Sequence, residues 1–170
     1  MLNKMLTLAS ITYLMLFTIT PLVHAADSSA PAPIQSVTTS YIQIHDALAK
    51  DSLDGVSAAA SVLEKAAQNN KTFPSELSQE AQALAQAKDL NTARDAFKPL
   101  SETLIKALGN DQIGSNNLVE AYCPMKQAHW LQTGSTVSNP FGTSMATCGS
   151  IVNGKAAPAA STCPMGGCGM

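Results

Sequence analysis

The sequence predicts a mainly α fold, an up-and-down four-helix bundle followed by a short irregular or β segment and a flexible tail. Apolar residues recur at helical spacing in four successive segments between residues 37 and 108. After residue 110 the composition changes to Gly, Ser and Asn with short β-branched runs. All the cysteines lie beyond residue 122. These features divide the chain into a helical part and a sulfur-bearing part.

The composition limits the classes of function that are open to the chain. Its 170 residues allow one domain with a tail, but no large multidomain enzyme. Twelve acidic residues against ten Lys and Arg give a net charge of −2. Nothing strongly basic is available to neutralise phosphates, which argues against a nucleic-acid partner.

Residues 1–25 have the pattern of a cleavable signal peptide. Lys4 supplies a positive start, residues 5–22 are mostly apolar, and small residues at Val23 and Ala25 follow Pro21. We expect cleavage after Ala25 and a periplasmic or secreted protein that leaves the membrane. The apolar run is long enough to cross a bilayer, so a permanent N-terminal anchor is the alternative.

Residues 26–33 are small, polar and Pro-containing, so we expect a flexible leader before a folded domain at residues 34–150. One apolar face predicts the first helix, and Asp54 is a good N-cap residue for the second. The two faces consist of Val37, Tyr41, Ile44 and Leu48, and of Val56, Ala59 or Ala60, Leu63 and Ala67.

Two further helices follow, the first starting at Pro74 and Ser75 and the second after a short break at residues 88–91. Gly109-Asn110 ends the last helix with good C-cap residues. Pro99 lies inside that helix, where it removes a backbone hydrogen bond and predicts a kink between Asp95 and Pro99. The apolar faces are Leu77, Ala81 and Leu84, then Ala93, Phe97, Leu100, Leu104 and Leu108.

Beyond residue 110 the sequence predicts loops and short extended pieces. Residues 111–117 are rich in Gly, Ser and Asn, and residues 118–125 and 137–148 each predict a short strand or extended segment. Residues 151–162 form a small-residue linker to a Cys/Met-rich tail, residues 163–170.

Every cysteine has a methionine two or three residues away. The pairs are Cys123 and Met125, Met145 and Cys148, Cys163 and Met165, and Cys168 and Met170. Thiolate and thioether are soft donors that select Cu(I), and by the same argument Ag(I), over hard cations. Zn²⁺ is less suited because it prefers Cys and His to Met. We therefore predict one sulfur-ligated Cu(I) or Ag(I) site in the domain and a second in the tail.

Disulfide bonds are the alternative use of the cysteines. An even number of cysteines in an exported protein is typical of a disulfide framework, here Cys123 with Cys148 and Cys163 with Cys168. For the first pair both interpretations stay open. For the tail pair a disulfide leaves Met165 and Met170 without a role, which favours metal.

Little in the sequence suggests catalysis, so we expect that the protein is not an enzyme. It has no Ser/His/Asp order, no Gly-rich phosphate loop and no HExxH. The mature chain keeps only His45 and His129 for acid–base chemistry. His129, four residues after Met125, is a possible metal ligand but more often such a residue lies at the surface or packs against its neighbours.

The runs AYCPMKQAHWLQ and NPFGTSMATCG, preceded by ARDAFKPLSETLI, resemble a helical domain of unknown function associated with periplasmic adaptor proteins of copper and silver efflux systems. The resemblance covers roughly residues 34–150 and implies metal handling. The turn at residues 139–142 is one residue shorter than the family form. The family's motif falls on Cys123, Pro124, Met125, Trp130, Asn139, Pro140, Gly142, Met145, Cys148 and Gly149.

Together these features predict a periplasmic Cu(I)- or Ag(I)-binding protein of heavy-metal resistance. The expected ligands are Cys123, Met125, Met145, Cys148, Cys163, Met165, Cys168 and Met170. Its role would be sequestration, or delivery of the ion to a periplasmic efflux adaptor as partner. The alternative is a disulfide-stapled helical interaction module without metal chemistry. The sequence leaves the oligomeric state open.

Overall fold

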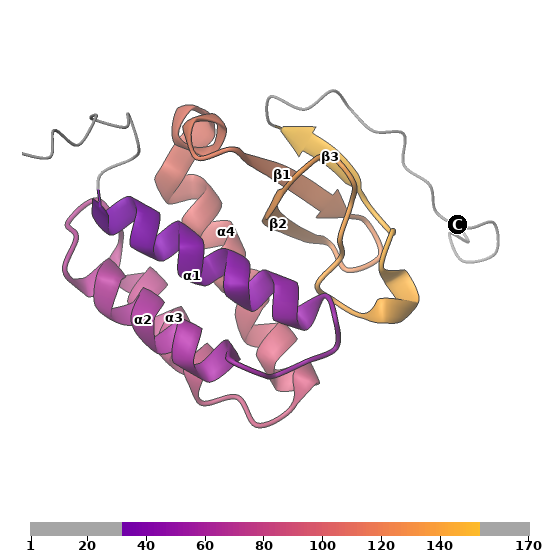
Figure 1. Cartoon of the computed structure of the whole chain (residues 1–170), viewed down its shortest axis with the longest axis horizontal. Helices are drawn as coiled ribbons and strands as arrows, with labels where there is room; N and C mark the ends of the chain where they lie inside the picture. The colour runs from indigo at the N-terminus through magenta and orange to yellow at the C-terminus, as the bar shows by residue number, and fades with distance from the viewer. Residues whose placement is uncertain (1–31, 154–170) are drawn as a thin grey trace, which may run out of the picture.

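The computed structural model describes residues 32–153, which form four helices and then a small antiparallel sheet (Figure 1). The fold is therefore mainly α, as the sequence predicts. The predicted signal peptide, most of the leader, most of the linker and the tail with its four sulfur residues lie outside the described residues. No helix within residues 32–153 has the length and hydropathy that crossing a membrane requires.

The helices are α1 (Ala32–Leu48), α2 (Val56–Gln68), α3 (Ser75–Ala85) and α4 (Leu90–Ser115). The predicted apolar faces are buried on all four, from Val37 on α1 to Leu108 on α4. Helix α1 begins at Ala32, two residues inside the predicted leader. The break at residues 88–91 matches the end of α3 and the start of α4, where the Asp89 carboxylate accepts a hydrogen bond from the Thr92 N–H over 2.9 Å.

The predicted N-cap of α2 and the predicted loop after Gly109 are wrong, whereas the predicted break at Gly109 is present. Asp54 does not cap α2, because Gly55, with φ of 76°, is the N-cap residue and makes no side-chain bond. In α4 the backbone leaves helical geometry at Gly109, with φ of 63° and ψ of 172°, which agrees with the predicted end of this helix, and Pro99 lies inside the helix. The chain then turns helical again to Ser115, where a loop was predicted, because Ile113 is buried and holds this turn on the domain.

The sheet consists of β1 (Leu118–Cys123), β2 (Ala128–Thr133) and β3 (Ser150–Asn153) in the order β2-β1-β3. Strand β1 confirms the first predicted extended segment, whereas residues 137–148 form a loop with one 3₁₀ turn, η1 (Thr143–Met145). The sequence missed β2, and β3 carries the fold to Asn153, beyond the predicted boundary at residue 150. The alternation of buried and exposed residues in β2 is weak, because its last positions before Thr133 are all buried.

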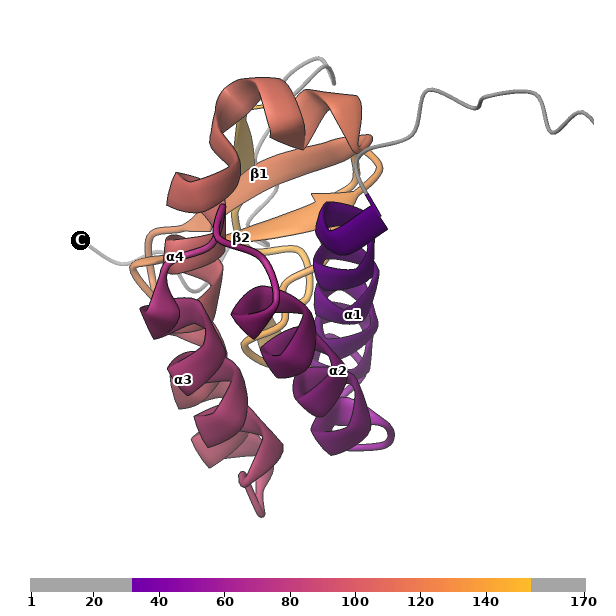
Figure 2. The same cartoon turned by 90° about the vertical axis from the view of Figure 1, so that its left-hand side faces the viewer.

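Each helix packs against the next one along the chain, and the sheet packs against α4 and α1 (Figure 2). Strand β2 contacts both α1 and α4, which contact each other less than the consecutive helices do. A run of aromatic rings joins these elements. Tyr41 stacks on Phe97 with ring centroids 5.0 Å apart, Phe97 lies 6.3 Å from Phe141, and Phe141 lies 6.1 Å from Trp130. The largest side chains of an Ala-rich core therefore gather where the sheet meets the helices.

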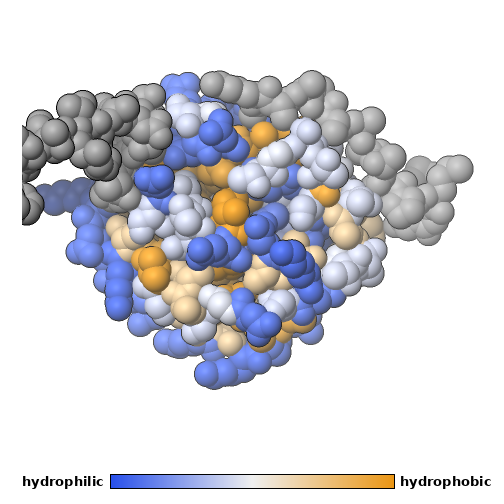
Figure 3. Space-filling view, in the orientation of Figure 1, coloured by the Kyte–Doolittle hydropathy of each residue, from blue (hydrophilic) through white to orange (hydrophobic). Residues whose placement is uncertain are grey.

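On the face seen in Figure 3, polar side chains cover most of the surface and apolar ones form small scattered groups. The large apolar side chains that are exposed within residues 34–153 are Val62, Met125 and Val152.

Candidate metal centre

Cys123 and Cys148 meet inside the domain. Cys123 is the last residue of β1, Cys148 follows η1, and their Sγ atoms lie 3.5 Å apart. Cys123 is 0% exposed and Cys148 is 4% exposed. A disulfide bond needs a sulfur separation of about 2.05 Å, so the two sulfurs are in contact without a covalent bond.

Strand geometry directs Cys123 into the domain. Side chains alternate between the two faces of a strand, so Ala121 and Cys123 share one face of β1. Ala121 pairs with Trp130 and Cys123 pairs with Ala128 on β2, and all four residues are fully buried. The Cys123 thiol therefore belongs to the sheet face that the rest of the domain covers.

Asn139 holds the backbone of Cys148 in place. Its Nδ2 donates to the Cys148 carbonyl over 2.8 Å, and its Oδ1 accepts from the Phe141 N–H over 2.8 Å. Its own N–H donates to the Ala146 carbonyl over 2.9 Å. Because Asn139 is completely buried, these bonds fix the loop on both sides of η1 without competition from water.

Gly149 brings the chain after Cys148 close to the sheet. A Cβ at this position would lie 2.8 Å from the Tyr122 carbonyl oxygen and 3.0 Å from Cη2 of Trp130. Its φ of 134° is also one that residues with a side chain rarely adopt. The glycine therefore allows the chain directly after Cys148 to approach β1 and the indole ring of Trp130.

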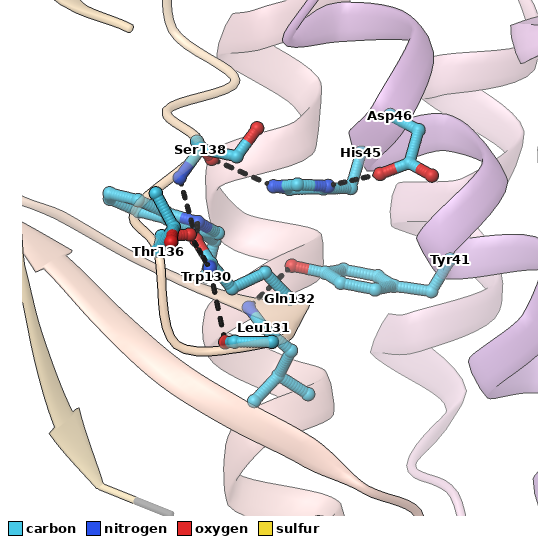
Figure 4. Close-up of polar contacts among 9 residues, drawn as sticks. Tyr41, His45, Asp46, Trp130, Leu131, Gln132, Thr136 and Ser138 are labelled. Atoms are coloured by element: carbon cyan, nitrogen blue, oxygen red, sulfur yellow. Dashed lines mark hydrogen bonds and ion pairs between the residues drawn. The ribbon is translucent and has the colours of Figure 1, made fainter. Parts of the chain in front are cut away.

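The loop between β2 and η1 is tied to Gln132 and to α1 (Figure 4). The amide oxygen of Gln132 accepts from the Ser138 N–H over 3.0 Å and from Nε1 of Trp130 over 3.1 Å. Its Nε2 donates to the Thr136 carbonyl over 2.6 Å. From α1, the buried His45 places Nε2 2.9 Å from the Ser138 carbonyl oxygen.

Arg94 ties the far side of the same loop to the helices. Its Nε donates to the Pro140 carbonyl over 2.8 Å, its Nη2 donates to the Leu48 carbonyl over 3.0 Å, and the guanidinium pairs with Asp51. The Thr143 hydroxyl donates to Oδ2 of Asp51 over 2.5 Å. The Thr143 hydrogen bond and the Arg94 charge hold the pKa of Asp51 below its usual 3.8.

The Tyr41 hydroxyl binds a backbone N–H on the outer edge of β2. It accepts from the Leu131 N–H over 3.1 Å and lies 2.7 Å from Oγ of Ser101, which donates to the Phe97 carbonyl. This assignment gives the Tyr41 hydroxyl one donor and one acceptor as partners. Complete burial raises the pKa of Tyr41 well above its usual value, so the hydroxyl stays neutral.

The two methionines of the domain take different positions around the thiols. Met145 is half-buried in η1 and packs against the core, and its carbonyl accepts from the Cys148 N–H over 2.8 Å. Met125 lies in the turn after Cys123 and is 52% exposed. Within residues 32–153 no three His, Cys, Asp or Glu side chains come together as metal ligands. The other four predicted ligands, Cys163, Met165, Cys168 and Met170, lie outside the described residues.

His129 does not join the thiol pair. It precedes Trp130 on β2, so its ring points to the opposite face of the sheet from the indole and from Cys123. There its Nδ1 lies 2.6 Å from Oε1 of Glu120, and the ring packs against Tyr122 with centroids 4.5 Å apart.

The structure gives three of the ten motif positions a supporting role. Asn139 and Gly149 position the backbone at Cys148, Trp130 is buried against Gly149, and none of the three is a soft donor. Sequence reasoning missed four further supports, which are His45, Asp51, Arg94 and Gln132. Their partners lie up to 93 residues away, and no local pattern marks such a pair.

These observations define a class, a mainly α domain with a small antiparallel sheet that encloses a pair of thiols. A family model described as "protein of unknown function (DUF3347)" matches residues 37–116. The match covers most of α1 and all of α2, α3 and α4, and it ends before β1, so it does not reach the cysteines. No curated protein and no solved structure matches the chain. The family's description names no metal and no efflux system.

Proposed function

We propose that the protein is an exported Cu(I)- or Ag(I)-binding protein whose domain site is Cys123 and Cys148. The observation that carries the proposal is the 3.5 Å contact between two sulfurs that are 25 residues apart in the chain. Two sulfurs bound to one ion at roughly 2.3 Å each lie at most about 4.6 Å apart. The thiol pair is inside that limit, so a soft ion needs only small side-chain movements to bridge it.

The surroundings favour a soft monovalent ion. A soft ion gains most from thiolates and thioethers, and Met125 and Met145 lie two and three residues from the cysteines. Met145 is half-buried and lies three residues before Cys148, so it is a better third ligand than Met125. Met125 is exposed and suits the capture of an ion on its way to the buried thiols.

The role that we propose is sequestration, or delivery of the ion to a periplasmic efflux adaptor. Export is supported by the signal-like pattern of residues 1–25, and the adaptor by the resemblance of the motif segment alone. A second donor set at Cys163, Met165, Cys168 and Met170 would let the ion pass between sites by ligand exchange.

A disulfide-stapled interaction module is the second candidate, and the same contact supports it. The two sulfurs need to approach by only about 1.5 Å to reach the bonded distance. Mass spectrometry of the intact protein, with alkylation of thiols after unfolding, separates the two candidates. A Cys123–Cys148 bond that resists mild reductant favours the staple, and two alkylated thiols favour the metal site.

Native mass spectrometry tests the metal function on residues 26–170, which contain the whole described fold. We expect the reduced protein to bind one Ag(I) in the domain and one in the tail. Cys163→Ser/Cys168→Ser should keep the domain ion, and Cys123→Ala/Cys148→Ala should lose it while circular dichroism stays helical. A reduced Cys163→Ser/Cys168→Ser protein that binds no ion would overturn the proposal.

Met145→Leu is the matched variant for the third ligand. Leucine keeps the apolar volume but has no sulfur, so the domain should fold normally. We expect Ag(I) to dissociate faster from the domain site of this variant. Val137→Leu, at another half-buried position packed against the core, is the control that should leave the dissociation unchanged.

A further inference from the structure

We propose that residues 143–148 are a lid over the thiol pair, which opens on glycine hinges to admit a soft ion and closes to complete the site. This lid contains η1 and carries two of the proposed ligands, Met145 and Cys148. The inference rests on the proposed function, because the ion that passes the lid is the one that Cys123 and Cys148 bind.

The thiol pair is closed off from solvent. Cys123 is 0% exposed and Cys148 is 4% exposed. An ion that arrives with water or other ligands around it cannot reach both sulfurs through such a surface, so part of the fold has to move away first. Local opening of one segment requires much less free energy than unfolding of the whole domain.

Cys123 lies on the side of the pair that stays in place. It is the last residue of β1, the central strand, which pairs with β2 on one side and with β3 on the other. Its partner across the hairpin is Ala128, and both residues are fully buried. Moving the Cys123 sulfur outward would separate the strands, so the opening has to come from the other thiol.

The lid is held more lightly than this strand, because most of its side chains face solvent. Its exposed residues are Thr143, Ser144, Ala146 and Thr147. Met145 and Cys148 are therefore the side chains that leave the domain when the lid opens. Asn139 donates to the carbonyls of Ala146 and Cys148. These two bonds break on opening, and they define the position to which the lid returns.

Thr143 forms a latch between the outer end of the lid and the helices. Its hydroxyl donates to Oδ2 of Asp51, in the connection between α1 and α2, and Arg94 pairs with the same carboxylate. Figure 1 shows η1, the short yellow-orange turn, at the edge of the molecule near the C-terminal end of α1. Thr143 is exposed and the Asp51 side chain is 36% exposed, so water can compete for this bond.

A glycine stands at each end of the lid. Gly142, directly before it, has φ of 144° and ψ of 141°, and a Cβ built there would meet two lid side chains, each 3.8 Å away. Gly142 therefore has room for the backbone rotation that a hinge needs. Gly149, directly after the lid, lies against the Tyr122 carbonyl and keeps that end on the sheet. Opening thus swings the two lid ligands outward while Cys123 stays, and closing clamps the ion between them.

Thiol labelling of the metal-free protein tests the lid directly. The reduced Cys163→Ser/Cys168→Ser protein is mixed with iodoacetamide, and the labelled cysteines are identified by mass spectrometry at early times. We expect Cys148 to react first, at a rate that low urea concentrations hardly change, because opening the lid exposes little surface. Thr143→Val should raise this rate by about threefold to tenfold, since it removes one hydrogen bond to a carboxylate.

Thr147→Val is the matched control, the same substitution at an exposed lid position outside the latch, and should leave the labelling rate unchanged. Equal rates at Cys123 and Cys148 that rise steeply with urea would overturn the inference, because both thiols would then be reached by unfolding of the whole domain. A Cys148 rate that Thr143→Val does not raise would overturn the latch and the lid with it.

The kinetics of ion binding provide a second readout. The latch is present in the closed lid with and without the ion, so its loss should speed capture and release by the same factor and leave the dissociation constant unchanged. Stopped-flow fluorescence of Trp130 follows Ag(I) capture, and release is measured into excess thiosulfate. A Thr143→Val protein with weaker binding and an unchanged capture rate overturns the lid alone. Absence of Ag(I) binding overturns the proposed function, while the labelling rates still decide whether the lid opens.

Discussion

The side-chain amide of Asn139 donates to the backbone carbonyl of Cys148 over 2.8 Å at a site where Asn139 is fully buried. The contact joins two parts of the sulfur-bearing motif that are nine residues apart. It explains why an asparagine precedes the turn, since only a side chain with both a donor and an acceptor can also bind the Phe141 N–H. The position of the Cys148 sulfur thus depends on a residue that is not itself a ligand.

Asn139→Ala should destabilise the domain by about 2–4 kcal/mol, because it removes the hydrogen bonds that Asn139 makes to a buried carbonyl and to a buried N–H. Urea unfolding followed by the fluorescence of Trp130 measures this directly. Asn69→Ala, which loses a single exposed bond to the Lys65 carbonyl, is the control and should change stability by less than about 0.5 kcal/mol. Similar losses for the two variants would contradict the supporting role of Asn139.

Gly149→Ala should be more damaging than Gly134→Ala. Both glycines have positive φ, 134° and 77°, so both variants strain the backbone. At Gly149 the new Cβ meets the Tyr122 carbonyl and the Trp130 ring, whereas at Gly134 it meets no atom of the described part of the chain within 4 Å. We expect thermal unfolding to show an extra loss of about 1–3 kcal/mol for Gly149→Ala. Equal melting temperatures would mean that the close approach of Gly149 is not needed.

Asp51 should make the domain sensitive to acid. Its pKa is below the usual 3.8 in the folded protein, so its contribution to stability is present above pH 3.8. That contribution is lost as the pH falls through the lower, folded pKa. Asp51→Asn keeps the size and tolerates the φ of 53°, but cannot pair with Arg94 as an anion.

The free energy of unfolding should therefore differ between Asp51→Asn and the parent at pH 6, and the difference should shrink below pH 3.8. Urea titrations at several pH values measure it. A difference that stays constant down to pH 2 would show that the Asp51 charge contributes nothing.

Glu80 should change stability with pH in the opposite direction to Asp51. Its Oε2 is buried and has no hydrogen-bond partner among residues 32–153, and Oε1 accepts from the Thr103 hydroxyl over 3.0 Å. Desolvation raises the pKa of the carboxyl above its usual 4.5. The stability that the protonated form contributes is present below pH 4.5 and is lost as the pH rises through the folded pKa.

Glu80→Gln, which stays neutral, should therefore equal or exceed the parent in stability at pH 7. The gain should vanish below pH 4.5. Glu64→Gln, at a half-buried position of α2 whose side chain accepts from Gln68 at the surface, is the control for the loss of one negative charge. A Glu80→Gln protein that is less stable at pH 7 would show that the ionised carboxylate has a favourable partner.

Much of the helical part could be predicted from the sequence because it depends on local periodicity. The spacing from Ala93 to Leu108 fixes which face of α4 is buried, and Gly109 marks where that face ends. The turn after Gly109 was mistaken for a loop because a single buried residue, Ile113, holds it. Strand β2 was missed because burial on both faces removes the alternation that identifies a strand.

Of the candidate site, only the sulfur-bearing residues could be predicted from the sequence. Spacing identified Cys123 and Cys148 as a pair, since each stands near a methionine, and the structure brings them into contact. Spacing could not show that His129 lies on the opposite face of the sheet from the two cysteines, because the face of a strand is known only after the strand is recognised. It also could not find Arg94, whose contacts with Leu48 and Pro140 exist only in the folded chain.

The central claim is that Cys123 and Cys148 bind a soft ion, and copper X-ray absorption spectroscopy tests it most directly. The sample is the Cys163→Ser/Cys168→Ser protein, reduced and loaded with one equivalent of Cu(I), so that only the domain site is occupied. We predict a first shell made of sulfur atoms at about 2.3 Å. A first shell of nitrogen or oxygen, or a protein that keeps no copper after buffer exchange, would contradict the claim.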